Sequence, residues 1–466
     1  MKIIFLILLI LISSCTLIGP DYKRPEFNLP NAYHQGTNKE NVVADLNNWW
    51  KLYQDPVLNA LMDEALIKNT DINAAIARVE ESDAYLKEVG AALLPEVDLN
   101  SQAIRNRVTT TGNKINGNPL NTGLRKDYLV RLGTSFELDF WGKLRRAKES
   151  ARAEYLASRF SKDTVVLTLQ SLLASNYLLL RSIDSQTLAL KANVKYREEN
   201  LTLTKKRLES GLVSALDVHQ AEAAYNNLLA QLSDLVRQRE IIFNQLTVLS
   251  GDMNLVIPDV AIDALITPPT PPSGLPSSLL ESRPDVREAE QMMIAANANI
   301  GIAKAALFPT IFLTANFGAQ SAALSNLNKS GSNIWGGGLG LSLPIFDSGR
   351  VRSKIDQATA KQKAALSYYE SSIQNAFKEV NNALVSLKEY TDQENDLKLT
   401  QDAAKKAMNI ASNRYKAGYS GYSEYLDAQR VYNDASIAYI QKRQLRLIAS
   451  VELFKTLGGG WQSQVQ

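Results

Sequence analysis

Few side chains in this sequence have the chemistry of a catalytic or metal-binding group. The 466 residues include two histidines, His34 and His219, and one cysteine, Cys15. They leave too little material for a transition-metal site or a disulfide framework. The glycines at 336–340 lie in an alternating segment and lack the Lys-Ser or Lys-Thr pair that completes a phosphate-binding loop. The sequence therefore predicts no enzyme, no cofactor and no metal site.

The balance of charge excludes another class of partner. Basic and acidic residues nearly match, at 51 and 48, and no basic stretch forms a footprint for nucleic acid. The length is sufficient for two or three domains and a large core. We therefore expect no nucleic-acid partner.

The one cysteine has a specific context at the N-terminus. Lys2 is followed by an apolar run from Ile3 to Ile12, and then by Ser13, Ser14 and Cys15. A basic start, a short apolar run and small residues describe a secretory signal peptide, here residues 1–14, because the run is too short to span a bilayer. The end of this segment resembles the lipobox of bacterial lipoproteins. That resemblance implies lipid attachment at Cys15, and hence an exported and anchored protein.

The elements that follow are repeated along the chain. Pro95 lies 214 residues before Pro309, and the segment 207–226 aligns with 414–433 at an offset of 207. Each copy has a helix, two strands joined by a polar loop, a very long helical run, a glycine turn and a closing helix. The first helices are expected from Asp55 to Leu94 and from Pro284 to Phe308. This pattern predicts a duplication with loops of different length.

The duplication sets the predicted domain boundaries. An N-terminal extended segment covers 15–54, the first copy 55–251 and the second copy 277–457, with a tail at 458–466. Six prolines fall within 252–276, between the copies. Proline at that density favours extended backbone and is typical of a connector.

The strand segments alternate between apolar and polar residues. In the second copy the apolar set is Ile311, Leu313, Ala315 and Phe317, opposed by Thr314, Asn316, Gly318 and Gln320. The alternation continues from Trp335 to Ile345, and in the first copy from Tyr128 to Phe140. Such a pattern fits either a half-buried soluble sheet or the wall of a membrane barrel.

The helical runs favour the barrel. Residues 143–207 and 350–416 contain neither proline nor glycine. At 1.5 Å per residue the first run could reach ~98 Å. An apolar stripe at 3/4 spacing follows the second run from Val351 to Ala411, with polar breaks at Gln362, Glu394 and Gln401. Helices of this length need partners along their whole extent, as in a coiled coil.

Together these elements predict an oligomer. Four strands per chain leave two open sheet edges, which a bilayer does not tolerate, and bacterial barrels start at eight strands. A ring of three chains would supply twelve strands and set the long helices side by side. The predicted fold class is mainly α with a membrane β-barrel: an internally duplicated chain whose coiled-coil helices form a trimeric α-barrel below a 12-stranded β-barrel.

Several long motifs resemble one known family. They are CTLIGPDYKRP at 15–25, the strand-to-helix junction 131–158, LLESRPDVREAE at 279–290, LSLPIFDSGRVRS at 341–353 and GYSEYLDAQRVYNDA at 421–435. The chain is similar, essentially end to end, to the outer membrane factor family of TolC/OprM-like exit ducts, and to its lipoprotein branch of RND efflux systems (NodT-type).

The resemblance implies a passive, homotrimeric duct in the outer membrane with a long periplasmic extension. It implies a periplasmic membrane-fusion adaptor and an inner-membrane RND pump as partners, outer membrane lipid around the barrel, and drugs or other small toxic compounds as cargo. It also places a periplasmic gate at Asp427, Arg430 and Glu424, and links Asp217 to Tyr415. Ser423 and Ser420 depart from the residues that the family often has at a constriction and at a latch.

Two alternatives remain open at this stage. The same scaffold would serve as the exit channel of a type I protein secretion system. A periplasmic coiled-coil lipoprotein without a pore would also have the long helices, if the four alternating segments formed a soluble sheet.

Overall fold

The structure is a computed structural model that describes residues 17–27, 30, 33, 46–107, 114–115, 118–119, 124–259, 261–268 and 283–459. The predicted signal peptide, Cys15, His34, residues 260 and 269–276 of the Pro-rich connector, and the end of the tail lie outside the described residues. The chain forms two compact units, and each takes segments from both sequence copies. Unit 1 comprises the described residues within 1–25, 79–158 and 289–369; unit 2 comprises those within 26–78, 159–288 and 370–466.

The predicted duplication is confirmed by the order and the lengths of the elements. Three pairs match in length: α3 (Thr70–Ala91) with α7 (Pro284–Ala305), β1 (Glu96–Arg107) with β5 (Thr310–Ser321), and α4 (Lys143–Glu209) with α8 (Arg350–Lys416). Each of the two long helices has 67 residues. The closing helices α5 (Ala215–Ser250) and α9 (Tyr422–Thr456) differ by one residue, with 36 and 35.

The predicted single helix from Asp55 to Leu94 is wrong. It is divided at Asn69 into α2 (Pro56–Lys68) and α3. Asn69 has extended backbone, and its side-chain oxygen accepts hydrogen bonds from the amides of Asp71 and Ile72 at 2.8 and 3.2 Å. This side chain satisfies amides that a new helix would otherwise leave unpaired, so it makes the break favourable.

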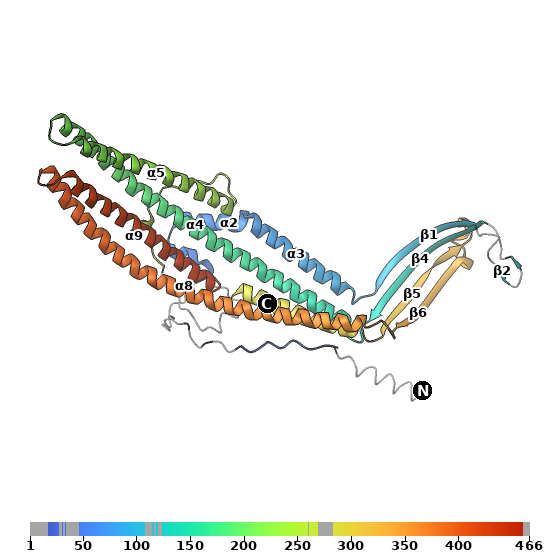
Figure 1. The fold of residues 1–466 in the computed structure, drawn as a ribbon. Coiled ribbons are helices and arrows are strands. Elements are labelled where there is room, and N and C mark those ends of the chain that lie inside the picture. Colours follow the sequence, from blue (N-terminus) through green and yellow to red (C-terminus); the bar gives the residue numbers. More distant parts are fainter. Residues whose placement is uncertain are drawn as a thin grey trace. The chain divides into compact units, whose positions relative to one another are not determined.

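Unit 1 contains a four-stranded antiparallel sheet in the order β1-β4-β5-β6, visible in Figure 1. β4 is Leu124–Leu138 and β6 is Asn333–Ser342, and a short hairpin pairs β2 (Lys114–Ile115) with β3 (Asn118–Pro119). The register places Leu99, Leu132, Phe317 and Trp335 in one row across the sheet. The apolar residues of the four alternating segments therefore share one face of the sheet.

The last strand is shorter than predicted. The alternation indicated strand as far as Ile345, but β6 ends at Ser342. Pro344 follows two residues later and has no amide hydrogen to donate to a sheet ladder. Ile345 and Phe346 lie beyond the strand and are 86% and 88% exposed.

The long helices begin at aspartate caps. In α4 the carboxylate of Asp139 accepts hydrogen bonds from the amides of Leu144 and Arg145, both at 3.0 Å. In α8 Asp347 accepts from the amide of Val351 at 2.9 Å. A carboxylate there pairs with free amides and with the positive end of the helix dipole. Both copies thus change from strand to helix by the same device.

The start of the described chain is fixed to the helices of unit 1. The amide of Ile18 donates to the carbonyl of Trp141 at 3.3 Å, and Arg146, with a side chain only 2% exposed, pairs with Asp21 at 2.7 Å. Gly19 lies against Gly301 of α7, where a Cβ on Gly19 would come within 2.6 Å of the Gly301 Cα. Leu17 to Pro20 therefore lie at the strand-to-helix junction of α4.

The core of unit 2 is formed around an aromatic helix turn. Trp49, Trp50 and Tyr53 of η1 (Leu46–Tyr53) are buried with residues from α2, α4 and α9. Trp49 stacks on Phe454 at 5.5 Å between ring centroids. This cluster explains how helices from both copies are joined to the segment that precedes α2.

The predicted stripe on α8 is confirmed. Its members from Val351 to Ala411 are buried or half-buried. One of its three polar breaks, Glu394, is 4% exposed and pairs with Arg443 at 3.0 Å and Arg446 at 2.9 Å, both in α9. A charged cluster thus joins α8 to α9.

One of the described helices, α4, contains an 18-residue window apolar enough to cross a bilayer, with a mean hydropathy of 1.2. Within the structure 56% of that window is buried. Burial of this kind is also typical of a core helix.

The described part of the connector is fastened by arginines. Arg239 pairs with Asp259 at 2.5 Å, Arg181 donates to the carbonyl of Pro258 at 2.5 Å, and Arg443 donates to the carbonyl of Leu265 at 3.0 Å. The segment includes the short helix η2 (Ile262–Ala264). Extended backbone without a ladder needs such donors for its carbonyls.

Two glycines with the same backbone angle give a matched prediction. Gly251 and Gly211 both have φ of +71°, but a Cβ on Gly251 would come within 2.8 Å of the Lys68 backbone, whereas Gly211 has open space. Gly211→Ala is expected to cost about 1 kcal/mol of left-handed strain. Gly251→Ala is expected to cost at least about 2 kcal/mol more, by analogy with overpacking. Denaturant unfolding of both variants measures the difference, and equal losses would contradict the clash.

Candidate functional site

The candidate site is formed by two turns of unit 2 that join α4 to α5 and α8 to α9. Gly211 and Gly418 have φ of +71° and +79°, and each follows the end of a long helix. In each turn an amide bonds back to a carbonyl five residues earlier: Leu212 to Arg207 at 2.8 Å, and Tyr419 to Arg414 at 2.9 Å. This is the Schellman arrangement, for which glycine is the least strained residue. The two turns have the same geometry at an offset of 207.

Three tyrosines support the second turn. The ring of Tyr415, 4% exposed, stacks on Tyr425 with centroids 5.7 Å apart and contacts Tyr422 at 5.5 Å. Ala221 of α5 belongs to the same buried cluster, so the cluster joins the start of α5 to the end of α8. Sequence reasoning selected Tyr415 alone, although tyrosines at this spacing on both sides of a glycine turn were a usable signal.

Arginines from α4 approach this cluster. The guanidinium carbon of Arg207 lies 4.7 Å from the centroid of the Tyr415 ring, a cation–π geometry. Burial raises the pKa of the Tyr422 phenol, and the charge of Arg197 opposes that rise. The Tyr422 phenol therefore stays neutral at physiological pH.

The predicted gate acids have cationic partners within the same chain. Asp427 pairs with Arg430 at 2.8 Å, three residues apart on α9, and both side chains are about two-thirds exposed. Glu424 pairs with Arg414 of α8 at 3.2 Å. Exposed pairs of this kind contribute about 0–1 kcal/mol each. These contacts therefore leave both acids free to respond to a neighbour.

Asp217 has a different role within the chain. Its carboxylate accepts hydrogen bonds from the amide and the hydroxyl of Ser214, both at 2.9 Å, as part of a capping box at the start of α5. Among the described residues no hydrogen bond joins it to Tyr415, whose hydroxyl has no partner there. The structure thus places Asp217 and Tyr415 at the same pair of turns without linking them.

Asp427 and Arg430 also line a polar cavity of about 470 Å³ between α4, α5 and α9. Amides on its wall include Asn193 of α4 and Asn433 of α9, which are joined by a hydrogen bond of 2.5 Å. Ser423 is part of the same wall. The site can therefore hold water and ions close to the acids.

The model of the outer membrane efflux protein family matches this chain over residues 61–252 and 275–459, one match for each copy. The chain belongs to this family. Its relatives include the probable efflux pump outer membrane protein TtgC of Pseudomonas putida, 32% identical, with 97% of this chain and 94% of the relative covered. The pyoverdine export outer membrane protein OpmQ of Pseudomonas aeruginosa is also 32% identical, with 98% and 97% covered.

Solved structures of family members have the same fold. The CmeC outer membrane channel of Campylobacter jejuni matches with a TM-score of 0.90 and 25% identity over 97% of this chain and 96% of its own. The open MtrE channel of Neisseria gonorrhoeae matches with a TM-score of 0.86 and 30% identity over 97% and 100%. The protein is thus an internally duplicated efflux channel of the outer membrane.

Proposed function

We propose that three copies of this chain form a passive exit duct that catalyses no reaction. The observation that carries the proposal is the sheet order β1-β4-β5-β6, which leaves β1 and β6 as open edges. Unpaired backbone groups at an edge are costly in lipid, and closure into a ring removes them. Three copies of four strands give twelve, within the range of bacterial barrels.

The same assembly would place the long helices of the three copies side by side. A passive duct has no energy source of its own, so another protein must drive transport. A further protein must join the duct to that pump without leakage. We propose a periplasmic membrane-fusion adaptor and an inner-membrane RND pump as its partners, and drugs or other small toxic compounds as its cargo. The efflux names of the relatives support this assignment.

A lipid anchor at Cys15 is part of the proposal. Leu17, two residues later, begins the segment that is fixed to the strand-to-helix junction near Trp141. Strands of a barrel end at the membrane surface. An acyl chain on Cys15 would therefore be within reach of the bilayer. The proposed removal of residues 1–14, and the remaining domain boundaries, stay predictions.

The mass of the protein in detergent tests the assembly. After correction for bound detergent, we expect a value near three times that of the mature chain. A monomer would leave both sheet edges open in lipid, and it would favour a coiled-coil lipoprotein without a pore.

The proposed gate has a second part besides Glu424 and Asp427. This second part is a link between Asp217 and Tyr415. In the assembled duct the free hydroxyl of Tyr415 would donate to Asp217. Tyr415→Phe removes only that hydroxyl, so we expect a higher open probability in planar bilayers and a loss of unfolding free energy of no more than about 1.5 kcal/mol. Tyr425→Phe is the control for loss of a phenol in the same cluster: it keeps the ring stack but removes the hydrogen bond that the Tyr425 hydroxyl accepts from Asn200 at 3.0 Å. Unchanged gating in Tyr415→Phe would remove Tyr415 from the gate.

A further inference from the structure

The sheet has an unusual distribution of charge at its end remote from the helices. Residues 99–126 contain five basic side chains and no acid, and residues 306–346 contain Lys329 as their one charged residue. The end of the sheet that carries the 108–123 and 322–332 loops is therefore strongly basic.

Three of these cations lie on the apolar face. Successive side chains of a strand point to opposite faces, so Arg105 and Arg107 share the face of Leu99 on β1. Lys126 shares the face of Leu132 on β4 in the same way. Arg105 and Lys126 are direct cross-strand partners, and all three side chains are exposed. Like charges directly opposite each other destabilise a strand pair.

The chain supplies no counter-charge for this cluster. None of the three side chains has an ion pair among the described residues, and the sequence of the 108–123 loop contains no acid. The acid next to Lys126 in the sequence, Asp127, belongs to the opposite face, where its carboxylate accepts a hydrogen bond from the side-chain amide of Gln320 at 3.0 Å. An anion from outside the chain would therefore relieve the repulsion between Arg105 and Lys126.

The height of the cluster indicates where that anion resides. Lys126 is twelve residues from Leu138, the helix-side end of β4. At ~3.3 Å per residue and a tilt of ~40°, that distance corresponds to a height of ~30 Å. The hydrocarbon layer of a bilayer is about as thick. With the apolar face toward lipid, the cluster lies at the level of the headgroups on the far side of the membrane.

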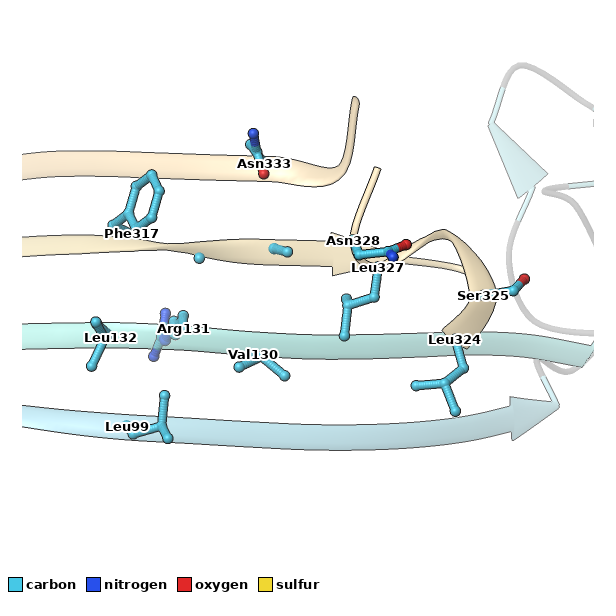
Figure 2. A pocket seen from close by; sticks show the side chains of 12 residues that line it. Leu99, Val130, Arg131, Leu132, Phe317, Leu324, Ser325, Leu327, Asn328 and Asn333 are labelled. Atoms are coloured by element: carbon cyan, nitrogen blue, oxygen red, sulfur yellow. The ribbon is translucent and has the colours of Figure 1, made fainter. Parts of the chain in front are cut away.

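An apolar pocket lies on the same face below the cluster. Leu324 and Leu327, from the loop after β5, line it together with Val130, Leu132 and Leu99 of the sheet, and Figure 2 shows the two loop leucines beside Val130. The pocket has a volume of about 560 Å³. Val130 is four residues from Lys126 along β4, ~13 Å, which is within the reach of one acyl chain from its headgroup.

We propose that Arg105, Arg107 and Lys126 bind the phosphates of a phosphorylated, multi-acyl lipid of the outer leaflet, with one acyl chain in the pocket below Leu324 and Leu327. Paired phosphates neutralise the like-charged cross-strand pair, and charge-assisted bonds from arginine are the strongest available. A soluble anion would neutralise the cations but would leave the pocket empty. The proposal rests on the apolar face of the sheet being turned toward lipid.

Binding of diphosphoryl lipid A to the purified full chain in detergent tests this site by native mass spectrometry. We expect the wild type to retain the lipid, and Arg105→Glu with Lys126→Glu to bind it at least about tenfold more weakly. Arg125→Glu is the matched control, because Arg125 has the same charge at the same height on the polar face. It should bind like the wild type. The neutral pair Arg105→Gln and Lys126→Gln should also weaken binding, and it serves if charge reversal prevents folding.

The form of the lipid distinguishes the source of the anion. Lipid A stripped of its phosphates should bind at least about tenfold more weakly, and inorganic phosphate should not displace the intact lipid. Equal binding of the stripped lipid, displacement by phosphate, or equal loss in Arg125→Glu would overturn the site. A trimer that fails to bind lipid A would refute this inference alone, whereas a monomer would refute the proposed duct.

Discussion

Glu394→Ala is expected to lower the unfolding free energy by about 3–5 kcal/mol. The side chain of Glu394 is 6% exposed, and it is shared by Arg443 and Arg446, which are each 14% exposed. Removal of the carboxylate leaves two desolvated guanidinium groups between α8 and α9. Arg443 keeps its hydrogen bond to the carbonyl of Leu265 and a pair with Asp263 at 3.3 Å, and Arg446 keeps a contact with the hydroxyl of Thr267. The carbonyl and the hydroxyl are neutral and Asp263 is largely exposed, so these contacts replace little of the lost charge.

The measurement is guanidinium unfolding in detergent, followed through the helical circular dichroism signal. Glu389→Ala is the control, because Glu389 lies on the same helix, is 50% exposed and, within the described part of the chain, forms an ion pair with its neighbour Lys388 alone. The control should change the unfolding free energy by less than about 0.5 kcal/mol. A Glu394 variant that unfolds at the same denaturant concentration as the control would show that this buried cluster contributes nothing.

The double variant Glu424→Ala, Asp427→Ala is expected to raise single-channel conductance severalfold. In the proposed trimer each acid is present three times around one axis, where it can attract cations and bind arginines of neighbouring copies. The pairs with Arg414 and Arg430 are exposed and weak within one chain, so they can be exchanged between copies. Loss of both acids removes the contacts that would hold the turns together.

Planar bilayer recordings measure this effect. Glu452→Ala is the control, because Glu452 is an acid of the same helix α9 with a similar exposure of 45% and lies at its other end. Its conductance should equal that of the wild type. Cation selectivity should fall in the double variant. Wild-type conductance in the double variant would mean that these acids do not close the duct.

Local pattern was sufficient to predict most of the elements. The alternation of Ile311, Leu313 and Phe317 needs only neighbouring residues to be read, and so does the absence of proline and glycine from 350–416. The offsets between copies followed from direct comparison. The two predictions with wrong boundaries, the single helix from Asp55 to Leu94 and the strand as far as Ile345, have local causes as well. The side-chain cap at Asn69 competes with a continuous helix, and Pro344 cannot donate the next hydrogen bond of the sheet.

Partners distant in sequence could not be predicted. Glu394 was visible as a polar break in the stripe, but nothing near it indicates Arg443 or Arg446, about 50 residues later. The spacing of three residues between Ser214 and Asp217 is enough to predict the capping box. The family resemblance instead predicts Tyr415 as the partner of Asp217. The stacking of Tyr415 on Tyr425 depends on how a turn brings two helices together, which spacing alone leaves open.

The equal length of α4 and α8 restricts how the helical part of such a protein can become longer or shorter in evolution. An insertion in α4 moves its turn outward, and the chain returns only if α5 gains the same number of residues. Because Ala221 of α5 packs against Tyr415 at the end of α8, the second copy must lengthen by the same amount. An insertion of seven residues, about 10 Å, keeps nearly the same helix face toward its neighbours. Variation in the length of these helices should therefore occur in steps of whole heptads, as four coupled insertions within one gene.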